Sequence, residues 1–111
     1  MQNGKRELIG NNMNNVHPGK VLIVDDDEFV VEILTAYFES ETPWIIHRCN
    51  NGNDVLSTVT SICPHIILLD LRLPDVDGLE LIHRLKNENG ISDIPVIVIS
   101  GHDDLFHKRQ A

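Results

Sequence analysis

Four short, mostly apolar runs recur along the chain and are separated by segments with helical spacing. The runs occupy residues 21–24, 44–48, 65–69 and 96–99. A run that is apolar on both faces is typical of a strand in a parallel sheet, because helices cover both sides of such a sheet. Strands that alternate with helices predict βαβ units with right-handed crossovers. The pattern therefore predicts an α/β protein with a doubly wound parallel sheet.

The segments between the runs carry apolar residues in the period of an α-helix. Residues 28–40 are expected to form the first helix, with one apolar face made of Val30, Ile33, Leu34, Tyr37 and Phe38. Residues 55–62 are expected to form a second helix. A third helix is marked by Leu81 and Leu85 and closes near Gly90, and residues 103–111 are expected to begin a fourth.

Composition and net charge indicate one folded domain without a broad basic surface. A chain of 111 residues with 41% hydrophobic residues can form one folded domain, which we expect at residues 20–111 after a flexible polar leader at residues 1–19. The net charge of −8 argues against a nucleic acid or membrane partner bound through a broad basic surface. No signal peptide or membrane span is expected, and Cys49 and Cys63 are expected to be buried thiols of a cytoplasmic protein.

Side chains that can bind a metal ion or take part in a reaction follow three of the four runs. Asp25, Asp26 and Asp27 follow the first run, Asp70 follows the third and Ser100 follows the fourth. In open parallel sheets, ligands bind beyond the carboxyl ends of the strands. Clustered carboxylates repel one another unless a cation is present, and Mg²⁺ accepts one or two carboxylates while keeping positions for phosphate oxygens. The pattern indicates a magnesium site at which a carboxylate attacks a phosphoryl group and a hydroxyl binds a phosphate oxygen.

Each of these residues also has a plain structural role open to it. Either of the last two aspartates after the first run could cap the first helix, Asp70 could be an ordinary loop residue, and Ser100 could belong to a turn. Asp75 and Asp77 precede the third helix and are expected to be loop or N-cap residues. The functional interpretation depends on the combination, because all three groups follow strands on the same side of the sheet.

Four stretches of sequence occur in an order and spacing that match one family. They are VLIVDDD at residues 21–27, ILLDLRLP at 67–74, DGLEL at 77–81 and PVIVIS at 95–100. Through them the chain resembles the response regulator receiver domains of two-component signalling, over about residues 20–105. The resemblance implies a flavodoxin-like sheet with strand order 2-1-3-4, to which the family adds a fifth strand and a last helix that we expect this chain to lack.

The resemblance also implies a role for each site residue. Asp70 would accept the phosphoryl group from a sensor histidine kinase or a phosphotransfer protein, and Ser100 would contact the phosphoryl group and act as the switch. Mg²⁺ would be held by Asp26 directly, by Asp25 through water, by Asp70 and by the backbone carbonyl of Arg72. No enzyme activity is expected beyond self-catalysed phosphoryl transfer and hydrolysis.

Two alternatives stay open beside this interpretation. The family has a lysine on its fifth strand. Lys108 and Arg109 come too early in the sequence to occupy that position. We therefore expect an incomplete domain with an exposed sheet edge. Such a chain could act as an interaction module that is not phosphorylated, or form a homodimer by edge pairing or element exchange. A phosphohydrolase of the haloacid dehalogenase type is disfavoured, because Phe29 stands where that family has Thr or Val.

Overall fold

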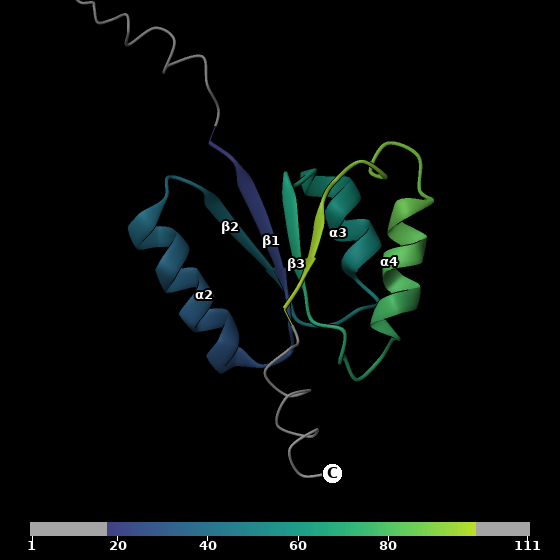
Figure 1. Cartoon of the computed structure of the whole chain (residues 1–111), viewed down its shortest axis with the longest axis horizontal. Helices are drawn as coiled ribbons and strands as arrows, with labels where there is room; N and C mark the ends of the chain where they lie inside the picture. Colours follow the sequence, from purple (N-terminus) through teal and green to yellow (C-terminus); the bar gives the residue numbers. More distant parts are fainter. Residues whose placement is uncertain (1–17, 100–111) are drawn as a thin grey trace, which may run out of the picture.

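The computed structural model describes residues 18–99, and within this range strands and helices alternate (Figure 1). The elements are β1 (Lys20–Val24), α2 (Glu28–Glu41), β2 (Ile45–Cys49), α3 (Val55–Ile62), β3 (Ile66–Leu69), α4 (Gly78–Lys86) and β4 (Val96–Val98). All four strands and three of the helices expected from the sequence are confirmed. The helix α4 ends at Lys86 rather than near Gly90, and the helix expected at residues 103–111 lies outside the described residues.

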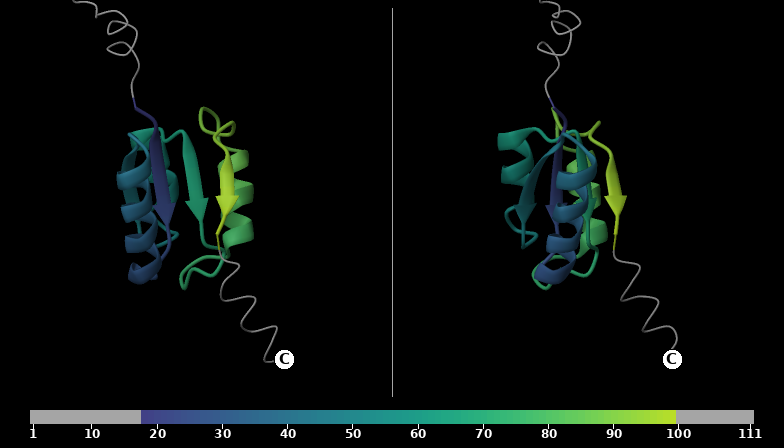
Figure 2. Two further views of the ribbon diagram at one scale, coloured as in Figure 1. Left: turned by 60° about the vertical axis from the view of Figure 1, so that its left-hand side comes forward. Right: turned by 90° about the vertical axis from the view of Figure 1, so that its left-hand side faces the viewer.

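The strands form one parallel sheet in the order β2-β1-β3-β4, which confirms the expected order (Figure 2). The central strand β1 pairs with β2 on one side and with β3 on the other, and Val24 is in register with Leu69. Because β1 and β3 are neighbours, their carboxyl ends lie side by side at the point where the chain order reverses. Asp25 and Asp70, the residues that follow these two strands, are thereby brought to the same edge of the sheet.

Helices cover both faces of the sheet, with α2 on one face and with α3 and α4 on the other (Figure 1). Alternate residues of each inner strand serve the two cores, because side chains of a strand point to opposite faces. The core beneath α2 contains Val21, Ile23 and Leu68, and the core beneath α3 and α4 contains Leu22, Val24, Ile67 and Leu69. The residues of β1 from Val21 to Val24 are fully buried, as expected of an inner parallel strand.

The apolar face expected for the first helix is only partly confirmed. Leu34 and Phe38 of α2 pack against the core, but Ile33 and Tyr37 are 52% and 58% exposed. The most deeply buried residue of the helix is Val31, which the expected face omitted. The face against the sheet is therefore shifted toward Val31 and Thr35, the two buried residues of the helix. The expectation for Ile33 and Tyr37 was wrong, because several apolar stripes fitted the same helical period.

The two cysteines differ in burial. Cys49, at the end of β2, is buried as expected, whereas Cys63 is exposed. Cys63 is the C-cap of α3 and has a left-handed backbone with φ of 50°. A residue that ends a helix in this conformation lies at the boundary of the core rather than within it, so the expectation of a buried Cys63 thiol was wrong. No helix among residues 18–99 is long and apolar enough to cross a membrane.

Candidate functional site

Three carboxylates meet at the carboxyl ends of β1 and β3. Asp25, Asp26 and Asp70 each offer one carboxylate oxygen, and these atoms all lie within 4.8 Å of one another. The parallel ladder continues past the strands, because the Asp70 N–H donates to the Val24 carbonyl at 2.9 Å and the Asp25 N–H donates to the Cys49 carbonyl at 3.2 Å. The backbone bonding of β1 to both neighbours thus sets the separation of these side chains.

The two inner carboxylates are buried and are held by the backbone that follows them. Asp25 and Asp70 are only 4% and 7% exposed, whereas Asp26 is exposed. The Asp27 N–H donates to Asp25 Oδ1 at 2.9 Å, and the Arg72 N–H donates to Asp70 Oδ1 at 2.9 Å. In each case an aspartate accepts a hydrogen bond from the second residue after it, which orients the carboxylate.

Burial and the neighbouring carboxylates disfavour the charged form of Asp25. The pKa of Asp25 is raised from its ordinary value of 3.8 to about 6, mainly because burial penalises the charged form. The Asp27 N–H opposes this rise in the pKa, while the nearby carboxylates of Asp70 and Asp26 add to it. A divalent cation with a preference for oxygen ligands would remove the conflict. The donor set, with two buried carboxylates and one exposed carboxylate, therefore fits Mg²⁺.

Two aspartates near the site cap helices and are not part of the carboxylate cluster. Asp27 caps α2 by accepting hydrogen bonds from the N–H groups of Phe29 and Val30 at 3.0 and 3.4 Å. Asp77 caps α4 by accepting from the Leu79 N–H at 2.9 Å, as expected from its position. Of the two capping candidates after β1, the cap is therefore Asp27, and Asp26 joins the carboxylate cluster instead.

One contact near the site has no signal in the local sequence. Asp75 lies in the loop between β3 and α4, where a loop residue was expected, but its carboxylate reaches across to the loop that precedes α3. It accepts hydrogen bonds from the N–H groups of Gly52 and Asn53 at 2.9 Å each. These bonds lower the pKa of the Asp75 carboxyl. Because the partners are more than twenty residues apart in the chain, no short motif could have predicted the pair.

For two of the expected site groups, the Arg72 carbonyl and the Ser100 hydroxyl, the expected role stays a prediction. Arg72 is exposed and its N–H orients Asp70, while the role of its backbone carbonyl as a magnesium ligand stays a prediction. Ser100 lies outside the described residues, as do Lys108 and Arg109. The strand that leads toward Ser100 pairs with β3 as far as Ile99, whose N–H donates to the Leu69 carbonyl at 2.9 Å.

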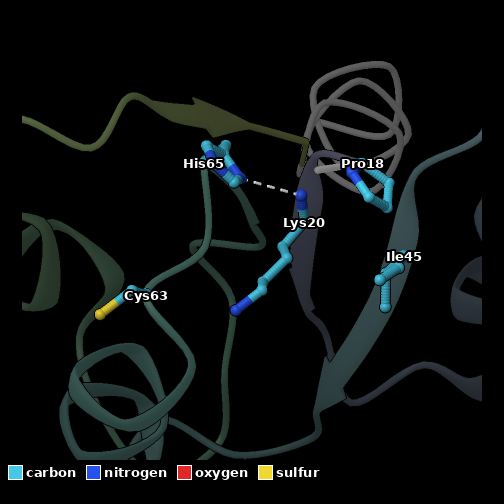
Figure 3. A pocket seen from close by; sticks show the side chains of 5 residues that line it. All are labelled: Pro18, Lys20, Ile45, Cys63 and His65. Carbon is cyan, nitrogen blue, oxygen red and sulfur yellow. Dashed lines mark hydrogen bonds between the residues drawn. The ribbon is translucent and has the colours of Figure 1, made fainter. Parts of the chain in front are cut away.

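A surface pocket of about 460 Å³ opens at the opposite end of the sheet (Figure 3). Its lining is Pro18, Lys20, Ile45, Cys63 and His65. The backbone N–H of Lys20 donates to His65 Nδ1 at 3.0 Å, and the Lys20 ammonium donates to the Ile62 carbonyl at 2.9 Å. The His65 side chain thus joins the start of β1 to the residue before β3, and the Lys20 side chain joins β1 to the end of α3. The pocket shares no residue with the carboxylate cluster.

Comparison with known proteins identifies related sequences and structures. Residues 21–111 match the family model described as the response regulator receiver domain. The transcriptional regulatory protein CssR of Bacillus subtilis (strain 168) is 39% identical over 83 residues, which cover 75% of this chain and 35% of CssR. The chain spans between 23% and 36% of the length of the first three curated relatives that it matches.

Solved structures show the same likeness. A putative response regulator from Chloroflexus aurantiacus J-10-fl aligns with a TM-score of 0.70 at 27% identity, covering 74% of this chain and 66% of that one. The phosphorylated cyanobacterial phytochrome response regulator RcpA aligns with a TM-score of 0.66 at 27% identity, covering 85% of this chain and 75% of that one. Both likenesses extend over most of the described residues.

Proposed function

Because the chain belongs to the response regulator receiver domain family, we propose that it is a phosphoacceptor signalling module in which Asp70 takes up the phosphoryl group. The observation that carries the proposal is the position of Asp70. Its carboxylate follows an inner strand, is oriented by the Arg72 N–H, and lies within 4.8 Å of the carboxylates of Asp25 and Asp26. The phosphorylated state of RcpA, to which the chain is similar, also supports this role.

The proposed reaction is the transfer of a phosphoryl group to a carboxylate. An oxygen of Asp70 attacks the phosphorus of a phosphohistidine on a sensor histidine kinase or phosphotransfer protein. The new P–O bond forms a mixed anhydride, the P–N bond breaks, and the histidine nitrogen leaves with the electron pair. Mg²⁺, when bound, neutralises the phosphoryl oxygens and the clustered carboxylates. We propose no reaction on a separate substrate, and hydrolysis of the aspartyl phosphate returns the resting state.

The remaining assignments belong to the same proposal. Mg²⁺, when bound, would be held by Asp26 directly, by Asp25 through water, by Asp70 and by the backbone carbonyl of Arg72. Ser100 contacts the phosphoryl group and acts as the switch. Residues 20–111 form the receiver domain after a leader at residues 1–19, and the protein works in the cytoplasm.

Intact-mass spectrometry after incubation with acetyl phosphate and Mg²⁺ tests the proposal. The wild-type chain should gain one phosphoryl group, and Asp70→Asn should gain none. Asp93→Asn is the matched control, because Asp93 is an exposed acidic residue outside the carboxylate cluster, and it should label like the wild type. Equal labelling of Asp70→Asn and the wild type would remove Asp70 from the phosphoacceptor role.

A second candidate function is pairing of β4 with another chain. Among the described residues β4 pairs with β3 alone, and Ile97 and Val98 are 47% and 46% exposed. An apolar strand at a sheet edge is a template for a further strand. Light scattering coupled to size-exclusion chromatography should then show a dimer that Ile97→Lys dissociates. A wild-type monomer across the micromolar range argues against this function.

A further inference from the structure

The loop that follows the proposed phosphoacceptor is tied to a loop from a different part of the chain. Residues 70–77 connect β3 to α4, and residues 50–54 connect β2 to α3, at the end of the sheet that carries the carboxylate cluster (Figure 1). Asp75 Oδ1 accepts the Gly52 N–H and Asp75 Oδ2 accepts the Asn53 N–H, each at 2.9 Å. One carboxylate thus uses both of its oxygens to join the two loops.

Two glycines allow close contacts of the loop at residues 70–77, one with the start of α4 and one with the loop at residues 50–54. Gly52 is buried beside Val76, and a Cβ atom at Gly52 would clash with Val76 Cγ2. Gly78, at the start of α4, lies against the backbone of Leu71, where a Cβ atom would be 2.5 Å from Leu71 Cα and 2.8 Å from its carbonyl oxygen. The backbone of Leu71, directly after the phosphoacceptor, therefore lies against the start of α4, and Val76 of the same loop lies against Gly52 in the segment that Asp75 contacts.

We propose that Asp75 is a positioning residue for phosphoryl transfer, which holds the backbone of Leu71 and Arg72 where the site needs it. The inference rests on the proposed function of Asp70. Asp75 is not part of the carboxylate cluster, so it acts through the loop and not on the phosphoryl group. The Arg72 N–H orients the Asp70 carboxylate, so a shift of this backbone turns the attacking group away from its working geometry.

The charge of Asp75 supports this role. A carboxylate that accepts two backbone N–H groups makes charge-assisted hydrogen bonds, which are stronger than neutral ones. These two bonds hold the pKa of the Asp75 carboxyl below its ordinary value, so the group is charged at neutral pH. A residue that only fastened the fold would change stability and leave the transfer rate of the folded protein unchanged, which separates the two roles in an experiment.

The first test compares Asp75→Ala, Asp75→Asn and the charge-matched control Asp93→Ala in the full chain. The rate of labelling by acetyl phosphate is measured at saturating donor and Mg²⁺, at a temperature where circular dichroism shows each variant folded. Asp75→Ala should label about 10-fold more slowly than the wild type, since misplaced reacting groups lose rate steeply. Asp75→Asn keeps one acceptor oxygen and should be intermediate, and Asp93→Ala should label like the wild type.

The second test moves the same loop from the other side. Gly52→Ala should push Val76 away and slow labelling by a similar factor, with Asp75 still present. Gly52→Ala/Val76→Ala should recover the rate, because alanine at position 76 lacks the Cγ atom that the new Cβ meets. This recovery decides the inference in the same way if Asp75→Ala does not fold.

The outcomes distinguish this inference from the proposed function. Wild-type rates in both Asp75→Ala and Gly52→Ala overturn the positioning role and leave Asp70 as the phosphoacceptor. Equal slowing by Asp93→Ala overturns it as well, because that result assigns the effect to net charge. Absence of labelling in the wild-type chain overturns the proposed function and the positioning role together.

Discussion

Replacing Asp25 with asparagine should make the metal-free protein more stable at neutral pH. The side chain is 4% exposed and shares its site with the carboxylates of Asp26 and Asp70, so its charge is unfavourable without a cation. Asparagine removes the charge and keeps an oxygen that accepts the Asp27 N–H, the hydrogen bond that Asp25 makes at 2.9 Å. The substitution therefore measures how much the charge lowers the free energy of unfolding, while the hydrogen bond from the Asp27 N–H is kept.

The size of the effect follows from the pKa of Asp25. The pKa rises from 3.8 to about 6 on folding, and each whole-number difference in pKa corresponds to about 1.4 kcal/mol. The folded protein binds this proton more tightly than the unfolded chain does, so the free energy of unfolding falls as pH rises from about 4 to about 6. Above that window the charged side chain costs the wild type about 3 kcal/mol, which asparagine recovers.

Urea denaturation of both proteins, with a chelator present and at intervals between about pH 4 and about pH 8, measures this difference. The advantage of Asp25→Asn should grow as pH rises to about 6 and then stay constant. Asp93→Asn should show no such growth, because Asp93 is exposed and outside the cluster. Mg²⁺ should stabilise the wild type more than Asp25→Asn, since the variant lacks one of the charges that attract the ion. A stability difference that does not vary with pH would refute the reasoning.

Three further outcomes are expected. Asp26→Asn should weaken Mg²⁺ binding in a calorimetric titration, because it removes a ligand charge from the cluster, and an unchanged affinity would argue against Asp26 as a ligand. Asp27→Ala should lower the free energy of unfolding by about 1 kcal/mol through loss of the α2 cap, with Asp27→Ser close to the wild type in denaturation experiments. The Asp75 carboxyl should titrate below its ordinary pKa in NMR spectra, because it accepts the N–H groups of Gly52 and Asn53. These bonds should stabilise the fold at pH values above the pKa that Asp75 has in the unfolded chain, and this stabilisation should disappear as pH falls through the lower pKa of the folded protein. An Asp75 pKa at or above the ordinary value would contradict this.

Much of the architecture could be predicted from the sequence, because its signals are local. A buried strand such as β1 is marked by its own apolar residues, and a helix by its own period. Asp25 and Asp70 could be placed at one edge of the sheet because parallel strands end on the same side. The order of the strands came from the resemblance to a family and not from any local pattern.

The sequence by itself thus determined the alternation of strands and helices and the gathering of acidic residues beyond the strand ends. Only the tertiary structure decided which stripe of α2 faces the sheet, where Val31 is buried and Ile33 is exposed. It also decided that Asp27 caps the helix while Asp26 joins the cluster, and that Asp75 reaches the backbone of another loop. These features depend on contacts between segments far apart in the chain, whose energies no periodicity or short motif encodes.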